Sequence, residues 1–271
     1  MIQIFIVIGT ILLIILIIFL FLDIIFTIFE YVYGLLFNKP FFVHFYLNIK
    51  KLDKGKQNIL EKNFPFYKSL SDSKKRYFVH RVRCFLDTYK FISKEDFLIT
   101  DEVMVLVSST FVMLTFGMRN FLFEELQTIL IYPNYYFSTI NNENHKGEFN
   151  PMMKAVVFSW ADFLLGLDVK NDNLNLGIHE FTHLLHYHSL KIENESTQIF
   201  LKQFKKINEI LEDQSFRNKL INSDYFRVYA YTNQFEFLAV IIEHYFETPN
   251  LFQQQFPDLY TNVSRMLNLN H

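Results

Sequence analysis

A short apolar stretch, "GIHEFTHLLHYH" from Gly177 to His188, contains four histidines and one glutamate. Within it, His179, Glu180 and His183 match the pattern H-E-x-x-H. Histidines four residues apart share one face of a helix, so their rings can bind a single tetrahedral ion. A glutamate beside that ion can polarise a water molecule and pass its proton to a leaving amine. The competing interpretation is that these are core histidines satisfied by hydrogen bonds. The apolar flanks favour a metal, because unpaired histidine and glutamate are costly in such surroundings.

The third ligand of such a site must come from elsewhere in the chain. In the extended pattern H-E-x-x-H-x-x-G-x-x-H it would be a histidine, but Ser189 stands at that position and His186 stands where glycine is required. We therefore expect a carboxylate from a later helix. The helical stretch "NQFEFLAVIIEHYFETP" offers three, and spacing alone does not choose among Glu236, Glu243 and Glu247.

The first 22 residues contain no charged side chain and consist mainly of Ile, Leu and Phe. A helix of about 20 apolar residues spans a bilayer core. A cleaved signal peptide would have a basic start, a shorter apolar run and a small-residue cleavage site, whereas here the apolar character continues past Asp23. We therefore expect a retained transmembrane anchor over residues 1–37.

Charges around this segment predict its orientation. No Lys or Arg precedes the apolar run, and six lysines follow it, at positions 39, 50, 51, 54, 56 and 62. By the positive-inside rule, we expect a single-pass membrane protein whose remaining chain lies in the cytoplasm. The lysines could also attract an anionic leaflet; the alternative is an ordinary solvated face.

The overall composition gives no support for a nucleic-acid-binding protein and excludes a protein with internal disulfides. A net charge of −2 in 271 residues gives no indication of nucleic-acid binding. The single cysteine, Cys84, excludes an internal disulfide, and its apolar helical position predicts a core thiol.

From residue 45 to residue 271 we expect one domain, because no repeat or low-complexity linker divides this part of the chain. Polar residues 168–176 lead into the histidine helix. The pattern of apolar residues predicts further helices from near Ser71 to about residue 92, from Thr100 to about Gly117, and over 196–211 and 233–247, the last ended by Pro249. The runs "QTILIYP" (127–133) and "KAVVFSW" (154–160) predict strands. Mostly helix with a small, segregated sheet is an α+β fold.

Four stretches carry a family resemblance: "TILIYPNYY", "VVFSWADFLLG", "GIHEFTHLL" and "YAYTNQFEFLAVIIEHYFETP". Together they resemble, in order, the Mlc titration factor A (MtfA) family of zinc peptidases. The similarity runs from about Leu60 to Leu267 and leaves out the N-terminal anchor. The family is also similar in its active site to the protease domain of anthrax toxin lethal factor. The resemblance thus implies a zincin-like metallopeptidase domain.

The resemblance also implies a role for individual residues. One zinc ion per chain would be held by His179, His183 and Glu236, with Glu180 as general base. Tyr229, in "VYAYTN", matches a tyrosine that stabilises the transition-state oxyanion in related sites, a role that suits a phenol donor. Ordinary packing is the alternative for Tyr229, since Tyr225 and Tyr231 lie nearby and the chain is rich in tyrosine.

One position departs from the family pattern. Family members commonly carry Asp three residues after the second ligand, whereas this chain has His186. An acceptor behind the metal ligands would then be missing or replaced, which affects metal affinity and rate. We expect His188 and His244 not to be ligands.

Two functions compete. The first is a membrane-anchored zinc metallopeptidase, aminopeptidase-like, which hydrolyses a peptide or protein substrate with a zinc-activated water and a glutamate base. Residues 154–160 are then expected to form the edge strand that pairs with an extended substrate. The alternative is a regulatory protein that captures a cytoplasmic partner at the membrane, because the family's namesake sequesters a transcriptional repressor. An intact H-E-x-x-H favours the enzyme, since binding needs no general base.

Overall fold

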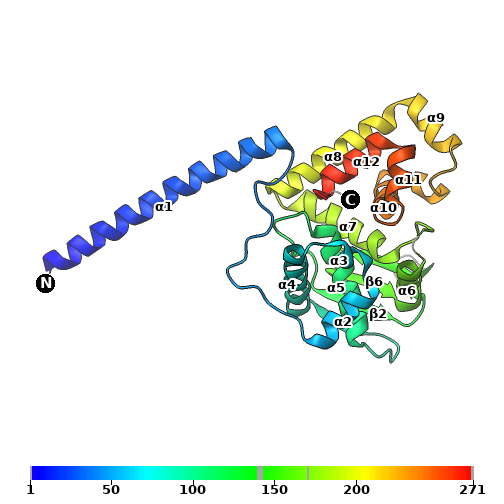
Figure 1. The fold of residues 1–271 in the computed structure, drawn as a ribbon, viewed down its shortest axis with the longest axis horizontal. Helices are drawn as coiled ribbons and strands as arrows, with labels where there is room; N and C mark the ends of the chain where they lie inside the picture. Colours follow the sequence, from blue (N-terminus) through cyan, green and yellow to red (C-terminus); the bar gives the residue numbers. More distant parts are fainter. Residues whose placement is uncertain (1, 139–142, 170, 270–271) are drawn as a thin grey trace.

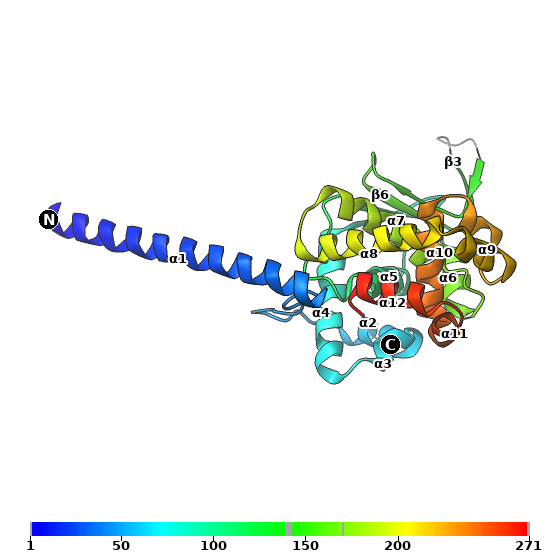
Figure 2. The same cartoon turned by 90° about the horizontal axis from the view of Figure 1, so that it is seen from above.

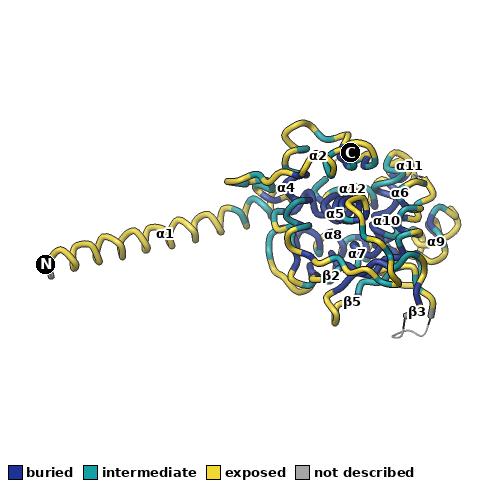
Figure 3. Tube along the Cα trace, turned by 90° about the horizontal axis from the view of Figure 1, so that it is seen from below, coloured by how far each residue is buried: buried dark blue, intermediate teal, exposed yellow. Residues whose placement is uncertain are grey.

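One long helix, α1 (Ile2–Phe37), opens the chain and projects away from all the other elements (Figure 1). The computed structural model describes residues 2–138, 143–169 and 171–269. With 36 residues, α1 is about 54 Å long, and residues 3–29 are all exposed (Figure 3). By length and composition, α1 could cross a membrane.

The end of α1 is attached to the rest of the protein by ion pairs. Arg119 lies 2.6 Å from a carboxylate oxygen of Glu30 in α1 and 3.1 Å from one of Glu195. Arg119 also donates to the carbonyl of Phe42 at 3.2 Å, just beyond the helix. The last turns of α1 are therefore held by these contacts rather than by chain connectivity alone.

Among the first helices of the remaining chain, α5 (Asp101–Thr115) is almost completely buried. Its start is capped by Thr100, whose hydroxyl accepts from the amide of Val103, which confirms the helix expected from there. The helix expected from near Ser71 ends at Thr88, because residues 90–93 form a strand instead. Pairing with a distant strand overrides the local helical pattern there. The bounds are α2 Lys54–Asn63, α3 Pro65–Ser69, α4 Asp72–Thr88 and α5 Asp101–Thr115.

The main sheet has four strands in the order β1-β2-β6-β5, of which the first three are parallel and β5 is antiparallel to β6. The strands are β1 Lys90–Ser93, β2 Thr128–Tyr132, β5 Gly147–Asn150 and β6 Ala155–Ser159; β3 Tyr136–Ser138 and β4 Glu143–His145 form a separate pair. The strands expected at 127–133 and 154–160 are confirmed as β2 and β6.

The expectation that residues 154–160 form an edge strand is wrong. β6 lies between β2 and β5, and all five of its residues are buried, as is typical of an interior strand. The edge strand on the β6 side of the sheet is the more polar β5, "GEFN", which is only partly buried.

A second group of helices surrounds α7 (Leu176–Lys191), the helix that carries the histidines (Figure 2). α7 packs against α5, α8, α10 and β5. The polar connection before it ends at Asn175, whose side chain caps α7 by accepting from the amide of Ile178 at 3.0 Å. Pro249 not only follows α10 but is the first residue of the next helix. The other bounds are α6 Trp160–Asp168, α8 Glu195–Glu212, α9 Gln214–Asn222, the 3-10 helix η1 Val228–Tyr231, α10 Gln234–Glu247, α11 Pro249–Gln255 and α12 Pro257–Leu267.

One large hydrophobic core joins the helices to one face of the sheet, and a smaller cluster on the other face contains Leu130, Tyr136, Ala155 and Val157. The centre of the large core is aromatic: Phe181 of α7 contacts Phe111 of α5 at 5.3 Å and Phe158 of β6 at 5.3 Å between ring centroids. The α+β expectation, mostly helix with a small sheet, is confirmed. α7 is thus anchored on its inner face, and its other face is free to build a site.

Candidate metal centre

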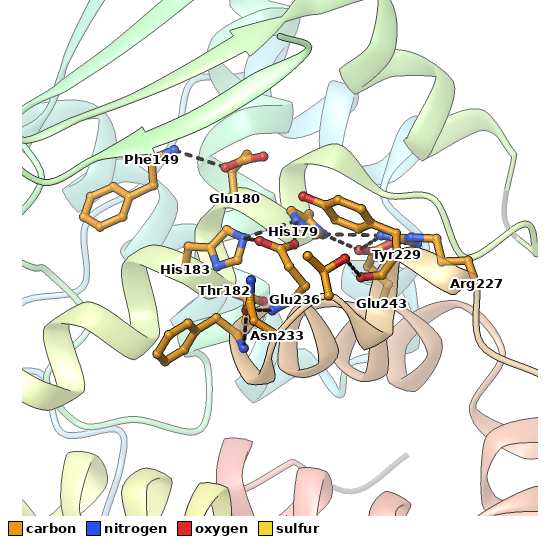
Figure 4. A network of polar contacts seen from close by, with 12 residues as sticks. Phe149, His179, Glu180, Thr182, His183, Arg227, Tyr229, Asn233, Glu236 and Glu243 are labelled. Atoms are coloured by element: carbon orange, nitrogen blue, oxygen red, sulfur yellow. Dashed lines mark hydrogen bonds and ion pairs between the residues drawn. The ribbon is translucent and has the colours of Figure 1, made fainter. Parts of the chain in front are cut away.

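Three side chains from two helices, one buried and two half-buried, converge beside α7 (Figure 4). His179 and His183, one turn apart on α7, face each other with their Nε2 atoms 3.2 Å apart. Glu236 of α10 reaches both: its Oε2 lies 2.9 Å from His179 Nε2 and its Oε1 lies 3.5 Å from His183 Nε2. Ligand atoms at 2.0–2.1 Å around a tetrahedral ion are roughly 3.3–3.5 Å apart. The donors lie 2.9–3.5 Å apart, close to this spacing, so small side-chain movements would let all three bind one tetrahedral ion.

The start of α10 fixes Glu236 in this position. The side chain of Asn233 caps the helix and accepts from the amides of Phe235 and Glu236 at 2.8 and 3.0 Å. Burial alone would raise the pKa of Glu236, but hydrogen bonds to His179 and His183 outweigh it and hold that pKa well below its usual value. Of the three glutamates that sequence spacing left open, Glu236 is the one that meets both histidines.

Glu243 lies behind the histidines instead. Seven residues after Glu236 on α10, its Oε1 accepts from His179 Nδ1 at 2.7 Å. This contact orients the ring and leaves Nε2 available for a metal. Arg227 binds both carboxylate oxygens at 2.8 Å. Burial would raise the pKa of Glu243, yet Arg227 and His179 lower it, so the carboxylate stays charged.

The carboxylates around His179 favour a positive charge at the ligand atoms. Burial lowers the pKa of His179, but hydrogen bonds to Glu236 and Glu243 outweigh this effect and raise it to about 10. A metal ion would supply that charge in place of a proton. Glu247, the third candidate, binds the side chain of Asn175 at 3.1 Å and belongs to the cap of α7.

Glu180 lies beside the three donors and touches the edge strand. Its Oε2 accepts from the amide of Phe149 in β5 at 3.1 Å, and burial raises its pKa. β5 comes this close only because residue 147 is glycine: a Cβ there would lie 2.9 Å from Glu180 Cγ and 2.7 Å from Leu176 Cδ1. The free edge of β5 therefore faces the donors.

Tyr229 stands at the entrance to this site, on η1. Its ring lies 6.0 Å from that of His179, and it is 51% exposed. Burial and the nearby Glu236 raise the pKa of Tyr229 to about 12, so its hydroxyl keeps its proton at neutral pH. The neighbouring tyrosines are engaged elsewhere: Tyr231 donates to the carbonyl of Leu220 at 3.1 Å, and Tyr225 packs in an aromatic cluster. Packing therefore does not account for Tyr229.

Three other histidines near the site do not join the donors. His188 pairs with Glu125 at 2.7 Å, and His244 packs against Phe226. His186 is buried between Phe204 and Phe235, at ring distances of 4.8 and 4.9 Å. Burial lowers the pKa of His186 to about 4, so the ring is uncharged at neutral pH.

A cleft of about 460 Å³ opens over the donors and continues beside β5 along α7 towards Leu190. A second cavity of about 330 Å³ adjoins it on the side of the α7 N-terminus and includes Lys146 and Arg227. Both are lined by His179, Glu180, Tyr229 and Gly147, so the donors lie between two hollows.

Sequence reasoning missed Arg227 and the orienting role of Glu243. The spacing of seven residues between Glu236 and Glu243 places both on one face of a helix, which is a usable signal for Glu243. No comparable pattern in the sequence marks Arg227.

Comparison with known proteins adds two findings. The family model described as "Glucose-regulated metallo-peptidase M90" matches residues 44–267, a range that begins after α1 and includes every residue of the cleft. The uncharacterized protein slr2042 of Synechocystis sp. (strain ATCC 27184 / PCC 6803 / Kazusa) is 25% identical over 219 residues, which cover 75% of this chain and 80% of that protein.

Proposed function

The chain belongs to the M90 family of glucose-regulated metallopeptidases, and we propose that it is a membrane-anchored, zinc-dependent peptidase of the aminopeptidase type with a zincin-like fold. The observation that carries the proposal is the group of donor atoms from His179, His183 and Glu236, 2.9–3.5 Å apart. Two imidazoles and one carboxylate are a ligand set of catalytic zinc sites, which leave a fourth position open.

Zinc at this site supplies Lewis acidity, which activates water at neutral pH and polarises a carbonyl group. Glu180 accepts the proton of the attacking water and delivers it to the leaving amine. Its burial raises its pKa, which suits a group that gains and loses a proton near neutral pH. Tyr229, protonated at neutral pH, donates to the developing oxyanion. Glu243 and Arg227 orient His179 and act as positioning residues.

The substrate pairs with β5. An extended peptide adds to a sheet at a free edge, where main-chain groups supply affinity. β5 has that edge, and the Phe149 amide, which donates to Glu180, points from it into the cleft. An antiparallel pairing is the more stable arrangement. β6, which was expected to serve this purpose, has neighbours on both sides.

Aminopeptidase action needs an anion for the substrate's terminal ammonium group. Of the acidic residues that line the cleft, Glu180 and Glu236 belong to the metal centre, and Glu148 lies next to Phe149 on β5, so its side chain turns to the other face of the sheet, towards Tyr136. The exopeptidase part of the proposal is therefore tested on the substrate: an aminopeptidase should cleave peptides with a free N-terminus and leave the same peptides with an acetylated N-terminus intact.

We assign membrane anchoring to α1, with the peptidase domain in the cytoplasm. Support comes from the exposed apolar length of α1 and from the lysines that follow it, which favour the cytoplasmic side.

The test uses the full chain purified in detergent. Metal analysis should find one zinc per chain, and hydrolysis of peptides should stop with a chelator and return with zinc. Glu180→Gln should keep the zinc and lose turnover by about 10²–10⁴, the usual contribution of a general acid/base group.

The alternative function has a distinct outcome. A wild type that holds zinc, hydrolyses nothing in a broad peptide library and captures a cytoplasmic protein equally well with Glu180→Gln is a binding protein, and the peptidase proposal fails.

A further inference from the structure

Beyond the metal donors, the side of α7 that faces the cleft is apolar and aromatic. Helical periodicity puts His186, Tyr187 and Leu190 on the same face as His183, one and two turns further along. All three line the cleft that holds the donors. A peptide that is bound over the donors therefore contacts this surface next.

Two other elements close this half of the cleft. Phe149 of β5 stands opposite Tyr187, with ring centroids 5.5 Å apart. Phe235 at the start of α10 packs on His186 at 4.9 Å, and both residues line the cleft. We call these five residues the aromatic subsite: Phe149, His186, Tyr187, Leu190 and Phe235.

The residues of the aromatic subsite differ in their exposed fractions, in a way that suits a bound side chain. His186 is only 7% exposed and forms part of its floor, whereas Leu190 and Phe235 remain 59% and 39% exposed at its walls. Concave sites lined by apolar and aromatic groups are typical of ligand pockets. A large apolar side chain would cover these walls, whereas a cation would meet the positive charge of Lys191, whose Nζ lies 5.5 Å from the centroid of the Tyr187 ring.

The direction of the strand determines which substrate residue arrives there. β5 runs from Gly147, beside Leu176 and Glu180, to Phe149, beside Tyr187. A peptide antiparallel to β5 runs the opposite way, so its N-terminal part lies over the aromatic subsite. The other hollow, with Lys146, Asp162 and Arg227, then receives the C-terminal part.

We propose that the aromatic subsite binds the side chain on the N-terminal side of the scissile bond and selects large apolar or aromatic residues, with His186 as a specificity-determining residue. This inference rests on the proposed peptidase function and names its substrate class. A pocket of this kind discriminates by apolar contact, which is worth roughly 10–200-fold for a single methylene group. Phe or Leu should therefore be preferred over Ala at that position by at least about tenfold.

The first test maps cleavage sites in a peptide mixture that is randomised on both sides of the bond, with the full chain in detergent and mass spectrometry as readout. This design works for exopeptidase and endopeptidase action alike. We expect large apolar residues on the N-terminal side. Cleavage without this preference, or with the preference on the C-terminal side, overturns the inference and leaves the proposed function standing. No cleavage at all overturns both.

Two leucines provide matched variants. Leu190, 59% exposed, lies in the aromatic subsite, and Leu165, 55% exposed, lies in the other hollow. Leu190→Ala should lower the Phe-over-Ala ratio of kcat/KM at the N-terminal side by about tenfold, whereas Leu165→Ala should leave this ratio unchanged. Equal ratios in both variants overturn the inference.

The role of His186 is tested by substitutions that do or do not introduce a charge. His186→Asp puts a carboxylate on the floor, so the ratio of Phe to Lys cleavage should fall by at least about tenfold. His186→Gln stays uncharged and should retain the preference for Phe. Peptide affinities measured by calorimetry in the Glu180→Gln background, with zinc content checked, should show the same ratios without turnover. Unchanged Phe-to-Lys ratios in His186→Asp contradict its assigned role.

Discussion

Glu243 provides a test of whether a carboxylate that does not bind the metal controls how tightly the metal is held. It is 0% exposed, its Oε1 lies 2.7 Å from His179 Nδ1, and both its oxygens bind Arg227 at 2.8 Å. Glutamine has nearly the same shape but no charge. Its NH2 group cannot accept a hydrogen bond, so Glu243→Gln loses the acceptor of either Oε2, which binds Arg227 and the Asn175 amide, or Oε1, which binds His179 and Arg227.

The expected loss follows from these contacts. Removing the acceptor behind a metal-binding histidine costs about 10–100-fold in affinity, or about 1.4–2.7 kcal/mol. Glu243→Gln also leaves Arg227 without its counter-charge. A buried, broken ion pair costs up to about 3–5 kcal/mol, but the Arg227 side chain is 26% exposed. Because water screens it, we expect the free energy of unfolding of the metal-free protein to fall by about 1–3 kcal/mol.

Competition with a chelator of known affinity measures the zinc dissociation constant, and urea titration measures the stability of the metal-free protein. Glu247→Gln is the matched control: it alters a glutamate on the same helix, bound to Asn175 rather than to His179. Zinc affinity in Glu247→Gln should stay within about threefold of the wild type. Equal affinity in the two variants refutes the reasoning. Complete loss of zinc in Glu243→Gln, with zinc retained in Glu236→Gln, shows instead that Glu243 is the third ligand.

Other predictions concern turnover, packing and location. Tyr229→Phe should keep its zinc and lower kcat by about 10²–10³ with little change in KM; an unchanged kcat rules out the oxyanion role. Gly147→Ala should lower the free energy of unfolding by about 1–3 kcal/mol and impair turnover, because its Cβ meets Glu180 Cγ at 2.9 Å. Gly55→Ala, where the nearest atom is an Asp53 oxygen at 3.2 Å, should be nearly neutral, and similar losses in both argue against a special role for Gly147. The protein should stay in washed membranes and be protected from protease added to intact cells; release by salt alone contradicts the anchor, and digestion of the domain contradicts its orientation.

The parts of the site that follow from local periodicity could be predicted from sequence. The two histidines and Glu180 lie within one helical turn, so their geometry is a property of α7 itself. Glu236 and Glu243 lie two turns apart on one face of α10, yet they meet opposite nitrogens of the same His179 ring. Only the packing of α10 on α7 decides which one reaches His183, and no spacing rule contains that information.

The sheet shows the same limit. β2 and β6 are apolar runs between turn residues, and their strand character is local. β1 and β5 are short strands, "KFIS" and "GEFN", whose existence depends on partners far along the chain. The error about the edge had the same origin: the apolar run of β6 indicates burial on both faces, and its antiparallel neighbour was not visible in the sequence.

The hydrogen bond from the Phe149 amide to Glu180 links substrate arrival to the release of the base. In the proposed binding mode, a peptide carbonyl takes over this amide, and the carboxylate that it held becomes free to turn towards the metal centre. Without a peptide, the Phe149 amide and the Glu180 carboxylate remain hydrogen-bonded to each other. Small amides that lack a second backbone carbonyl cannot displace Glu180 in this way, and we expect them to be poor substrates even when their side chain fits.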